Sequence, residues 1–134
     1  MLFRSLANGR HLFTYRGHQG IVQPLDWSPD SKRIASSNRD NTVQVWNAVN
    51  GDRVFTYHGH TDLIEAIGWS ANGKRIASSS DDQTVQVWDA VNGDHVFTYR
   101  GHSAPCFALT WSPDSRYLAS ASLDATVQVW SPAS

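Results

Sequence analysis

The chain has 134 residues, 40% of them hydrophobic, with a formal net charge of −1 at pH 7 and a pI near 6.6. This composition is typical of a globular protein and excludes an intrinsically disordered one. The balanced charge, with no cluster of Lys and Arg among aromatic residues, argues against nucleic acid and against anionic membrane as partners. No apolar run is long enough to cross a membrane or to serve as a secretory signal, so we expect a cytoplasmic protein.

The sequence repeats itself with a period of 42 residues. Between residues 11–52 and 53–94, 24 of 42 positions are identical, and a period of this size indicates a repeat architecture. The repeats span about 5–46, 47–88 and 89–130. The six Trp fall at two equivalent positions in each repeat (27, 69, 111 and 46, 88, 130), which favours packing between repeats over a ligand cage.

Each repeat is expected to form four short antiparallel strands. In the middle repeat they are predicted at about 63–69, 75–79, 84–89 and 95–99, because runs such as Val85–Trp88 alternate apolar and polar residues. Turns are predicted at Ser28–Ser31 and its equivalents, before Asp40 and its equivalents, and at Asn-Gly pairs such as Asn50-Gly51. No window of the chain has helical periodicity.

The single cysteine, Cys106, cannot close an intrachain disulfide, so the fold does not depend on an oxidising compartment. It occupies the position of Val22 and Ile64 in the other repeats. We therefore expect Cys106 to be a small buried hydrophobic residue.

Gly-His at 59–60, followed by Trp88-Asp89, with Ile76-Ala77-Ser78 between them, resembles the WD-repeat family. The similarity covers nearly the whole chain, although only the middle repeat has Trp-Asp: Trp46 precedes Asn and Trp130 precedes Ser. The resemblance implies an all-β fold, a β-propeller in which each four-stranded repeat is one blade.

The resemblance also implies a structural tetrad in each blade, formed by His, Ser, Asp and Trp. Indole and imidazole N–H groups, a hydroxyl and a carboxylate can satisfy one another when they are buried together. The matching residues are His18, Ser36, Asp40 and Trp46; His60, Ser78, Asp82 and Trp88; and His102, Ser120, Asp124 and Trp130.

Ser, His and Asp together also suggest a nucleophilic triad, but a triad occurs once in a cleft, whereas this set occurs three times with a Trp. We therefore expect no enzyme activity. The spacing His58-x-His60 does not indicate a metal site, because His60 belongs to a tetrad and position 58 is Arg in the other repeats. No cofactor and no metal is expected.

Three blades cannot close a propeller, which needs at least about four. Residues 11–15 match an outer strand that has no blade of its own, and the last blade lacks this strand. We therefore expect a head-to-tail homo-oligomer in which residues 11–15 complete the last blade of a neighbouring subunit. A dimer with six blades and a trimer with nine are both compatible with the sequence.

In WD-repeat proteins the usual contact surface is the rim of the central channel, and the resemblance places it at two positions in each repeat. They are Gln23, Glu65 and Phe107 early in the first strand, and Arg39, Asp81 and Leu123 before the tetrad Asp. We expect a scaffold for protein–protein interaction that binds a protein or peptide here. A nascent or engineered propeller fragment whose only partner is itself is the alternative, and a lectin-like propeller that binds sugars or small molecules is the third.

Overall fold

The structure, a computed structural model, describes residues 9, 11, 14–18 and 24–132. These residues form eleven strands and no helix, which confirms the all-β prediction. The strands are β1 (Leu25–Trp27), β2 (Arg33–Ser37), β3 (Val43–Asn47), β4 (Arg53–Tyr57), β5 (Ile64–Trp69), β6 (Arg75–Ser80), β7 (Val85–Asp89), β8 (His95–Tyr99), β9 (Cys106–Trp111), β10 (Leu118–Ser122) and β11 (Val127–Trp130).

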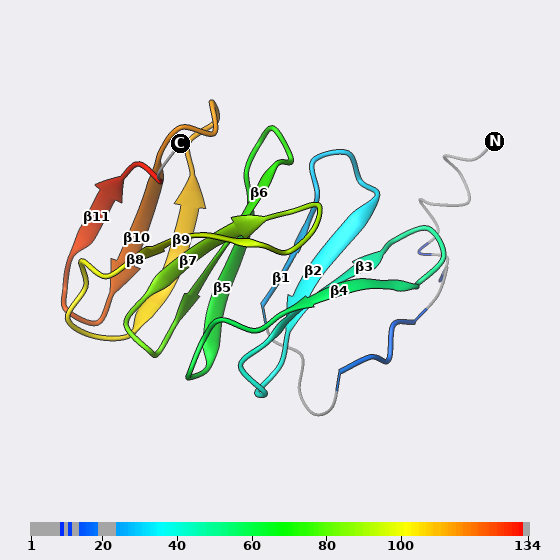
Figure 1. The fold of residues 1–134 in the computed structure, drawn as a ribbon, viewed down its shortest axis with the longest axis horizontal. Helices are drawn as coiled ribbons and strands as arrows, with labels where there is room; N and C mark the ends of the chain where they lie inside the picture. The colour runs from blue at the N-terminus through cyan, green and yellow to red at the C-terminus, as the bar shows by residue number, and fades with distance from the viewer. Residues whose placement is uncertain (1–8, 10, 12–13, 19–23, 133–134) are drawn as a thin grey trace.

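The strands form three antiparallel sheets, each built from consecutive strands (Figure 1). Sheet A has the order β1-β2-β3-β4, sheet B the order β5-β6-β7-β8, and sheet C the order β9-β10-β11. The predicted strands of the middle repeat agree with β5 to β8 to within a residue at each end. Sheet C has three strands where the other two sheets have four.

The turns lie where the sequence predicts them, and most depend on a residue with positive φ. Gly51 and Gly93, each at φ 80°, let the chain pass from the third to the fourth strand of sheets A and B. In the turn between the second and third strands of each sheet, the residue with positive φ is not a glycine. It is Asn41 at φ 67°, Gln83 at φ 73° or Ala125 at φ 69°.

The hydrophobic core lies between the sheets. Between sheets A and B it contains Val43 and Val45 from β3, which pack with Ile76 and Trp88 of sheet B. Between sheets B and C it contains Val85 and Val87 from β7, which pack with Cys106, Leu118 and Trp130. Because side chains alternate along a strand, the two valines of β3 and of β7 face the next sheet, and the Gln and Trp that alternate with them face the preceding side.

Tyr15 lies against sheet A, on the side opposite sheet B. Tyr15 stacks on Trp46 with ring centroids 4.5 Å apart and planes 3° apart. The predicted outer strand at 11–15 falls partly outside the described residues, and in a single chain His11, Thr14 and Tyr15 belong to no sheet. Within the described ranges, no helix is long and apolar enough to cross a membrane.

Candidate interaction surface

A chain of hydrogen bonds crosses the inside of sheet B. The indole N–H of Trp88 donates to Ser78 Oγ (3.3 Å), Ser78 Oγ lies 2.7 Å from His60 Nε2, and His60 Nδ1 lies 2.8 Å from Asp82 Oδ2. With the proton on Nδ1, the ring donates to the carboxylate and accepts from the serine hydroxyl, so a neutral imidazole satisfies every member. The set braces the blade from its second strand to the turn that follows.

Sheet C has the same set. Trp130 Nε1 donates to Ser120 Oγ (3.0 Å), which lies 2.8 Å from His102 Nε2, and His102 Nδ1 lies 2.9 Å from Asp124 Oδ2. In both sheets the backbone N–H of the residue after the His, Thr61 or Ser103, also donates to the carboxylate. The loop after Gly-His is thereby fixed to the turn that carries the Asp.

Sheet A differs from the tetrad that the sequence predicts. His18 Nε2 lies 2.6 Å from Ser36 Oγ, and Trp46 Nε1 donates to the same oxygen at 3.0 Å. His18 Nδ1, however, is buried without a hydrogen-bond partner among the described residues, and Asp40 accepts from Thr42 instead. The loop after His18, which fixes the carboxylate in the other sheets, falls at residues 19–23, outside the described ranges.

The network holds its carboxylates ionised. Burial by itself would raise the pKa of Asp82, but hydrogen bonds from His60 and Thr84 outweigh it and hold this pKa well below its usual range. In sheet C the hydroxyl of Thr126, together with His102 and against the effect of burial, does the same for the pKa of Asp124. Thr84 and Thr126 each donate to the carboxylate at 2.6 Å, so each network has a fifth member that the tetrad prediction does not include.

The serines of these networks are poor nucleophile candidates. Ser78 is fully buried and Ser120 almost so, and each hydroxyl already contacts a His and a Trp. A substrate could not reach either oxygen without displacing the Trp. His58, the other member of the His-x-His pair, is exposed, and no group of three or more His, Cys, Asp or Glu in the described part of the chain could hold a metal ion.

A second recurring contact joins neighbouring sheets and was not anticipated from the sequence. Tyr57 of β4 stacks on Trp88 of sheet B, with centroids 4.6 Å apart, and its hydroxyl donates to Gln86 Oε1 at 2.7 Å. The Gln86 amide in turn donates to the Gly59 carbonyl at 3.0 Å. A Cβ at Gly59 would overlap the Tyr57 ring and the Gln86 amide, which explains the glycine of the Gly-His pair.

This clamp of Tyr, Trp and Gln occurs three times. Tyr99 stacks on Trp130 at 4.3 Å and donates to Gln128, while Tyr15 stacks on Trp46 and donates to Gln44. The sequence signal was present, since Tyr and Gln recur with the 42-residue period. What the period does not reveal is that the Tyr and the Gln of one clamp lie on different sheets: Tyr57 belongs to sheet A and Gln86 to sheet B.

The rim residues lie at one end of the sheets. In sheet B, the backbone N–H of Asp81 donates to the Leu63 carbonyl at 2.9 Å, and the neighbouring Asp81 carboxyl group raises the pKa of Glu65. The structure therefore brings the two rim positions of this blade together. Arg39 is exposed at the equivalent point of sheet A, and Gln23 lies outside the described residues.

Sheet C places two apolar side chains at the same positions. The backbone N–H of Leu123 donates to the Pro105 carbonyl at 3.0 Å, as Asp81 does to Leu63. Phe107 is 49% exposed and Leu123 70% exposed. The rim thus changes from an acidic pair in sheet B to an apolar pair in sheet C, on a framework that is otherwise repeated.

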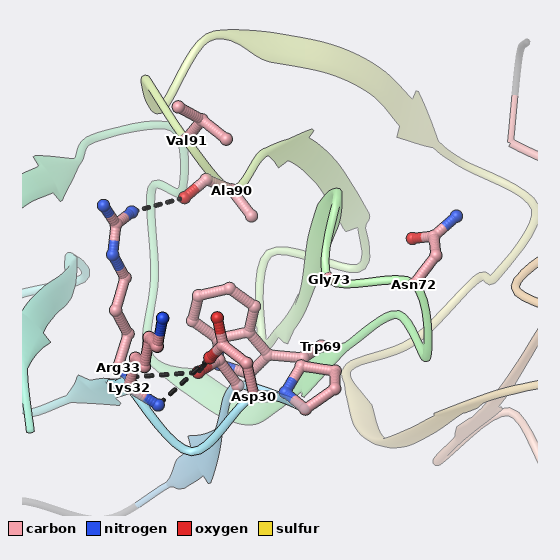
Figure 2. A pocket seen from close by; sticks show the side chains of 10 residues that line it. Asp30, Lys32, Arg33, Trp69, Asn72, Gly73, Ala90 and Val91 are labelled. Atoms are coloured by element: carbon pink, nitrogen blue, oxygen red, sulfur yellow. Dashed lines mark hydrogen bonds between the residues drawn. The ribbon is translucent and has the colours of Figure 1, made fainter.

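A cavity of about 340 Å³ lies at the opposite end of sheets A and B (Figure 2). Arg33 Nη1 reaches across it and donates to the Ala90 carbonyl at 3.3 Å, beside Trp69. A similar cavity of about 380 Å³, lined by Arg75 and Trp111 among others, lies between sheets B and C. Because the cavity recurs at both junctions, we interpret it as a consequence of blade packing and not as a selective site.

Comparison with known proteins identifies the architecture. The family model "WD domain, G-beta repeat" matches residues 9–47, 51–89 and 93–131, which together make up most of the chain. The chain belongs to the WD-repeat family. Two solved WD-repeat structures, "Structure of U3-55K" and "Crystal structure of RRP9 WD40 repeats", superpose with TM-scores of 0.84 and 0.83 at 27% identity. Each match covers 87% of this chain and 37% of the other, so the chain spans little more than a third of these WD-repeat structures.

Curated relatives match a single WD repeat's length of sequence. Eukaryotic translation initiation factor 3 subunit I of Aspergillus niger is 49% identical over 41 residues, which is 31% of this chain and 12% of the relative. Protein HIRA of Zea mays is 45% identical over 40 residues, which is 30% of this chain and 4% of the relative. Each of these two matches is about as long as one WD repeat and covers only a small part of the relative.

Proposed function

We propose that the protein is a non-catalytic WD-repeat scaffold for protein–protein interaction, assembled as a homo-oligomeric ring, which binds a protein or peptide at its rim. The observation that carries the proposal is the rim of sheet C. Phe107 and Leu123 are exposed there at positions where the other repeats have polar residues, on a turn fixed by the Asp124 network. Exposed apolar side chains on a rigid support can serve as the anchor of an interface.

Two further features support a scaffold. Ser78 and Ser120 are hydrogen-bonded within structural networks. The side chains that vary between repeats lie at the rim. One relative is by its name a subunit of a translation initiation factor and therefore a member of a protein assembly. Since the fold needs no disulfide, it does not depend on an oxidising compartment, and we propose the cytoplasm as its location.

A random peptide library displayed on phage would test the rim. Peptides selected on the wild-type protein, with an apolar residue in common, should bind the Phe107→Ala/Leu123→Ala variant at least about tenfold more weakly, the equivalent of roughly 1.4 kcal/mol. Val91→Ala is the matched control, because Val91 is exposed on the β7–β8 turn away from the rim. If no selected peptide distinguishes the double variant from the control, the rim is not the binding surface.

The second candidate is a propeller fragment, natural or engineered, whose only partner is itself. The identity of 24 of 42 positions between residues 11–52 and 53–94 favours it, because little divergence has accumulated between these repeats. In that case the ring forms but the peptide selection yields no rim-dependent ligand. The same experiment therefore separates the two functions.

A further inference from the structure

The junctions between neighbouring sheets follow one pattern. At each junction the preceding sheet presents two fully buried valines from its third strand. They are Val43 and Val45 in sheet A, and Val85 and Val87 in sheet B. The following sheet presents a Trp at the end of its first strand. Trp69 Nε1 donates to the Asp26 carbonyl at 3.1 Å, and Trp111 Nε1 donates to the Gly68 carbonyl at 2.9 Å.

Each outer sheet carries one unused half of this junction. On sheet C, Val127 and Val129 are the equivalents of Val85 and Val87 but are 69% and 71% exposed. On sheet A, Trp27 stands at the end of the first strand and is 52% exposed, whereas its equivalent Trp69 in sheet B is 8% exposed. The two bare faces are therefore complementary to each other, and neither is complementary to itself.

Tyr15 shows how the two faces fit together. Tyr57 and Tyr99, which form clamps with the following sheet, belong to the fourth strand of the preceding one. Tyr15 forms the same clamp with Trp46 and Gln44, but it belongs to none of the sheets formed by the described residues. Tyr15 therefore already lies where a tyrosine from the fourth strand of a preceding blade would lie.

In the described part of the chain, sheet C has three strands and no fourth. In sheet B, β7 and β8 pair with Val85 opposite Tyr99 and Gln86 opposite Thr98. Val127 and Gln128 are the equivalents of Val85 and Gln86 one repeat later, and Tyr15 and Thr14 are the equivalents of Tyr99 and Thr98 two repeats earlier. The same register therefore sets Val127 opposite Tyr15 and Gln128 opposite Thr14 of another chain. The Tyr15 clamp and the strand register thus point to the same arrangement, in which sheet C of another copy lies next to sheet A.

We propose that sheet C of one copy docks on sheet A of a second copy in the geometry of the internal junctions, with the second copy's Thr14 and Tyr15 in the fourth strand of that sheet C. Trp27 of the second copy then donates its indole N–H to the Thr110 carbonyl of the first. This inference rests on the ring proposed above and names the surface that closes it. The interface is heterologous, so closure occurs when the rotation per copy divides a full circle, as with six or nine blades.

Disulfide trapping would test the register. In a Cys106→Val background, one chain carries Thr14→Cys and a second carries Gln128→Cys, because cysteines opposite one another on paired antiparallel strands lie within disulfide range. After the two chains are mixed under denaturing conditions, refolded and oxidised, the proposal expects a covalent species of twice the 14.9 kDa chain mass. The proposal also expects neither chain to cross-link when it is oxidised by itself.

Gln86→Cys is the matched control for Gln128→Cys. Gln86 has the same environment in sheet B, but Thr98 of its own chain already lies opposite it, so Thr14→Cys should not trap it. Trapping of Thr14→Cys equally by both cysteines, or by a second Thr14→Cys, would overturn the proposal. If the wild-type chain is oligomeric but the Thr14–Gln128 pair is not trapped, the register is wrong while the proposed ring stands. A monomeric wild-type chain removes both.

A charge at the bare face gives an independent measurement. Val129→Asp should convert the oligomer into a folded monomer of 14.9 kDa, because it places a carboxylate against Trp27 and its apolar neighbours in the junction. In the separate chain Val129 is exposed, so circular dichroism should still show a folded β-sheet protein. Val91→Asp, at a valine of similar exposure outside both faces, should leave the oligomer intact. An oligomer that survives Val129→Asp would contradict the proposal.

Discussion

Tyr15 lies on Trp46 as Tyr57 lies on Trp88: the ring centroids are 4.5 and 4.6 Å apart, and both pairs of planes are within 3° of parallel. One of these tyrosines is held by a strand of the preceding sheet, and the other precedes the first sheet of the chain. The chain thus carries its own copy of a contact that belongs between blades. This relationship is the strongest structural support for a ring made of several chains.

Tyr57 should contribute to stability through both its ring and its hydroxyl. Tyr57→Phe leaves Gln86 Oε1 without its donor and should cost about 1 kcal/mol of unfolding free energy, whereas Tyr57→Ala also removes the stack on Trp88 and should cost about 3–5 kcal/mol. Urea denaturation at a fixed chain concentration measures both. Tyr117→Phe, at an exposed tyrosine, is the control and should change little; equal losses for the two Phe variants would disprove the clamp.

Ser78 is expected to be structural. Ser78→Ala leaves Trp88 Nε1 and His60 Nε2 buried without a partner, which should lower the unfolding free energy by about 2 kcal/mol. Ser103→Ala, at an exposed serine, is the control. A fluorophosphonate probe for nucleophilic serines should label neither wild type nor variant. Labelling that disappears in a normally folded Ser78→Ala protein would instead indicate catalysis.

The depressed pKa values of Asp82 and Asp124 predict acid sensitivity. A carboxyl group with a folded-state pKa below its unfolded value near 3.8 stabilises the fold above that value, and the contribution is lost as pH falls towards the folded-state pKa. Unfolding free energy should therefore decrease from about pH 5 to about pH 2. Asp82→Asn should flatten this dependence, whereas Asp94→Asn, at an exposed residue, should leave it unchanged. Identical pH profiles for the two variants would contradict the network.

Ala125 offers a stabilising substitution. Its φ of 69° lies in the left-handed region, which costs a residue with a Cβ about 1–2 kcal/mol. Ala125→Gly relieves this strain but adds chain entropy to the unfolded state, so the net gain should be about 0.5–1 kcal/mol. Ala121→Gly, within β10, has no strain to relieve and should destabilise by a similar amount. A loss of stability in Ala125→Gly would show that this turn relaxes by another route.

The strands and turns were predictable because they depend on local sequence that recurs. Alternation in Val85–Trp88 identifies a strand, and the repeated Asn-Gly pairs identify a turn, wherever the repeat begins. The members of the His60 and His102 networks follow from family resemblance, since each network closes within one repeat. Repetition carries this information three times, which makes the pattern easy to recognise.

Contacts between repeats were less accessible to the sequence. The bond from Trp69 ends on the backbone carbonyl of Asp26, and the equivalent bond from Trp111 ends on Gly68; a carbonyl acceptor imposes no choice of side chain and leaves no signal. The His18 site differs from its equivalents although its residues match them. Residue identity fixes what a site can contain, whereas the neighbouring loop and blade determine which bonds form.

The mass of the wild-type chain in solution, measured by size-exclusion chromatography with multi-angle light scattering, tests the central claim most directly. The two complementary faces predict a discrete species of two or three times 14.9 kDa that persists on dilution into the micromolar range. A compact, folded species of 14.9 kDa, with Val127, Val129 and Trp27 all open to solvent, would contradict it.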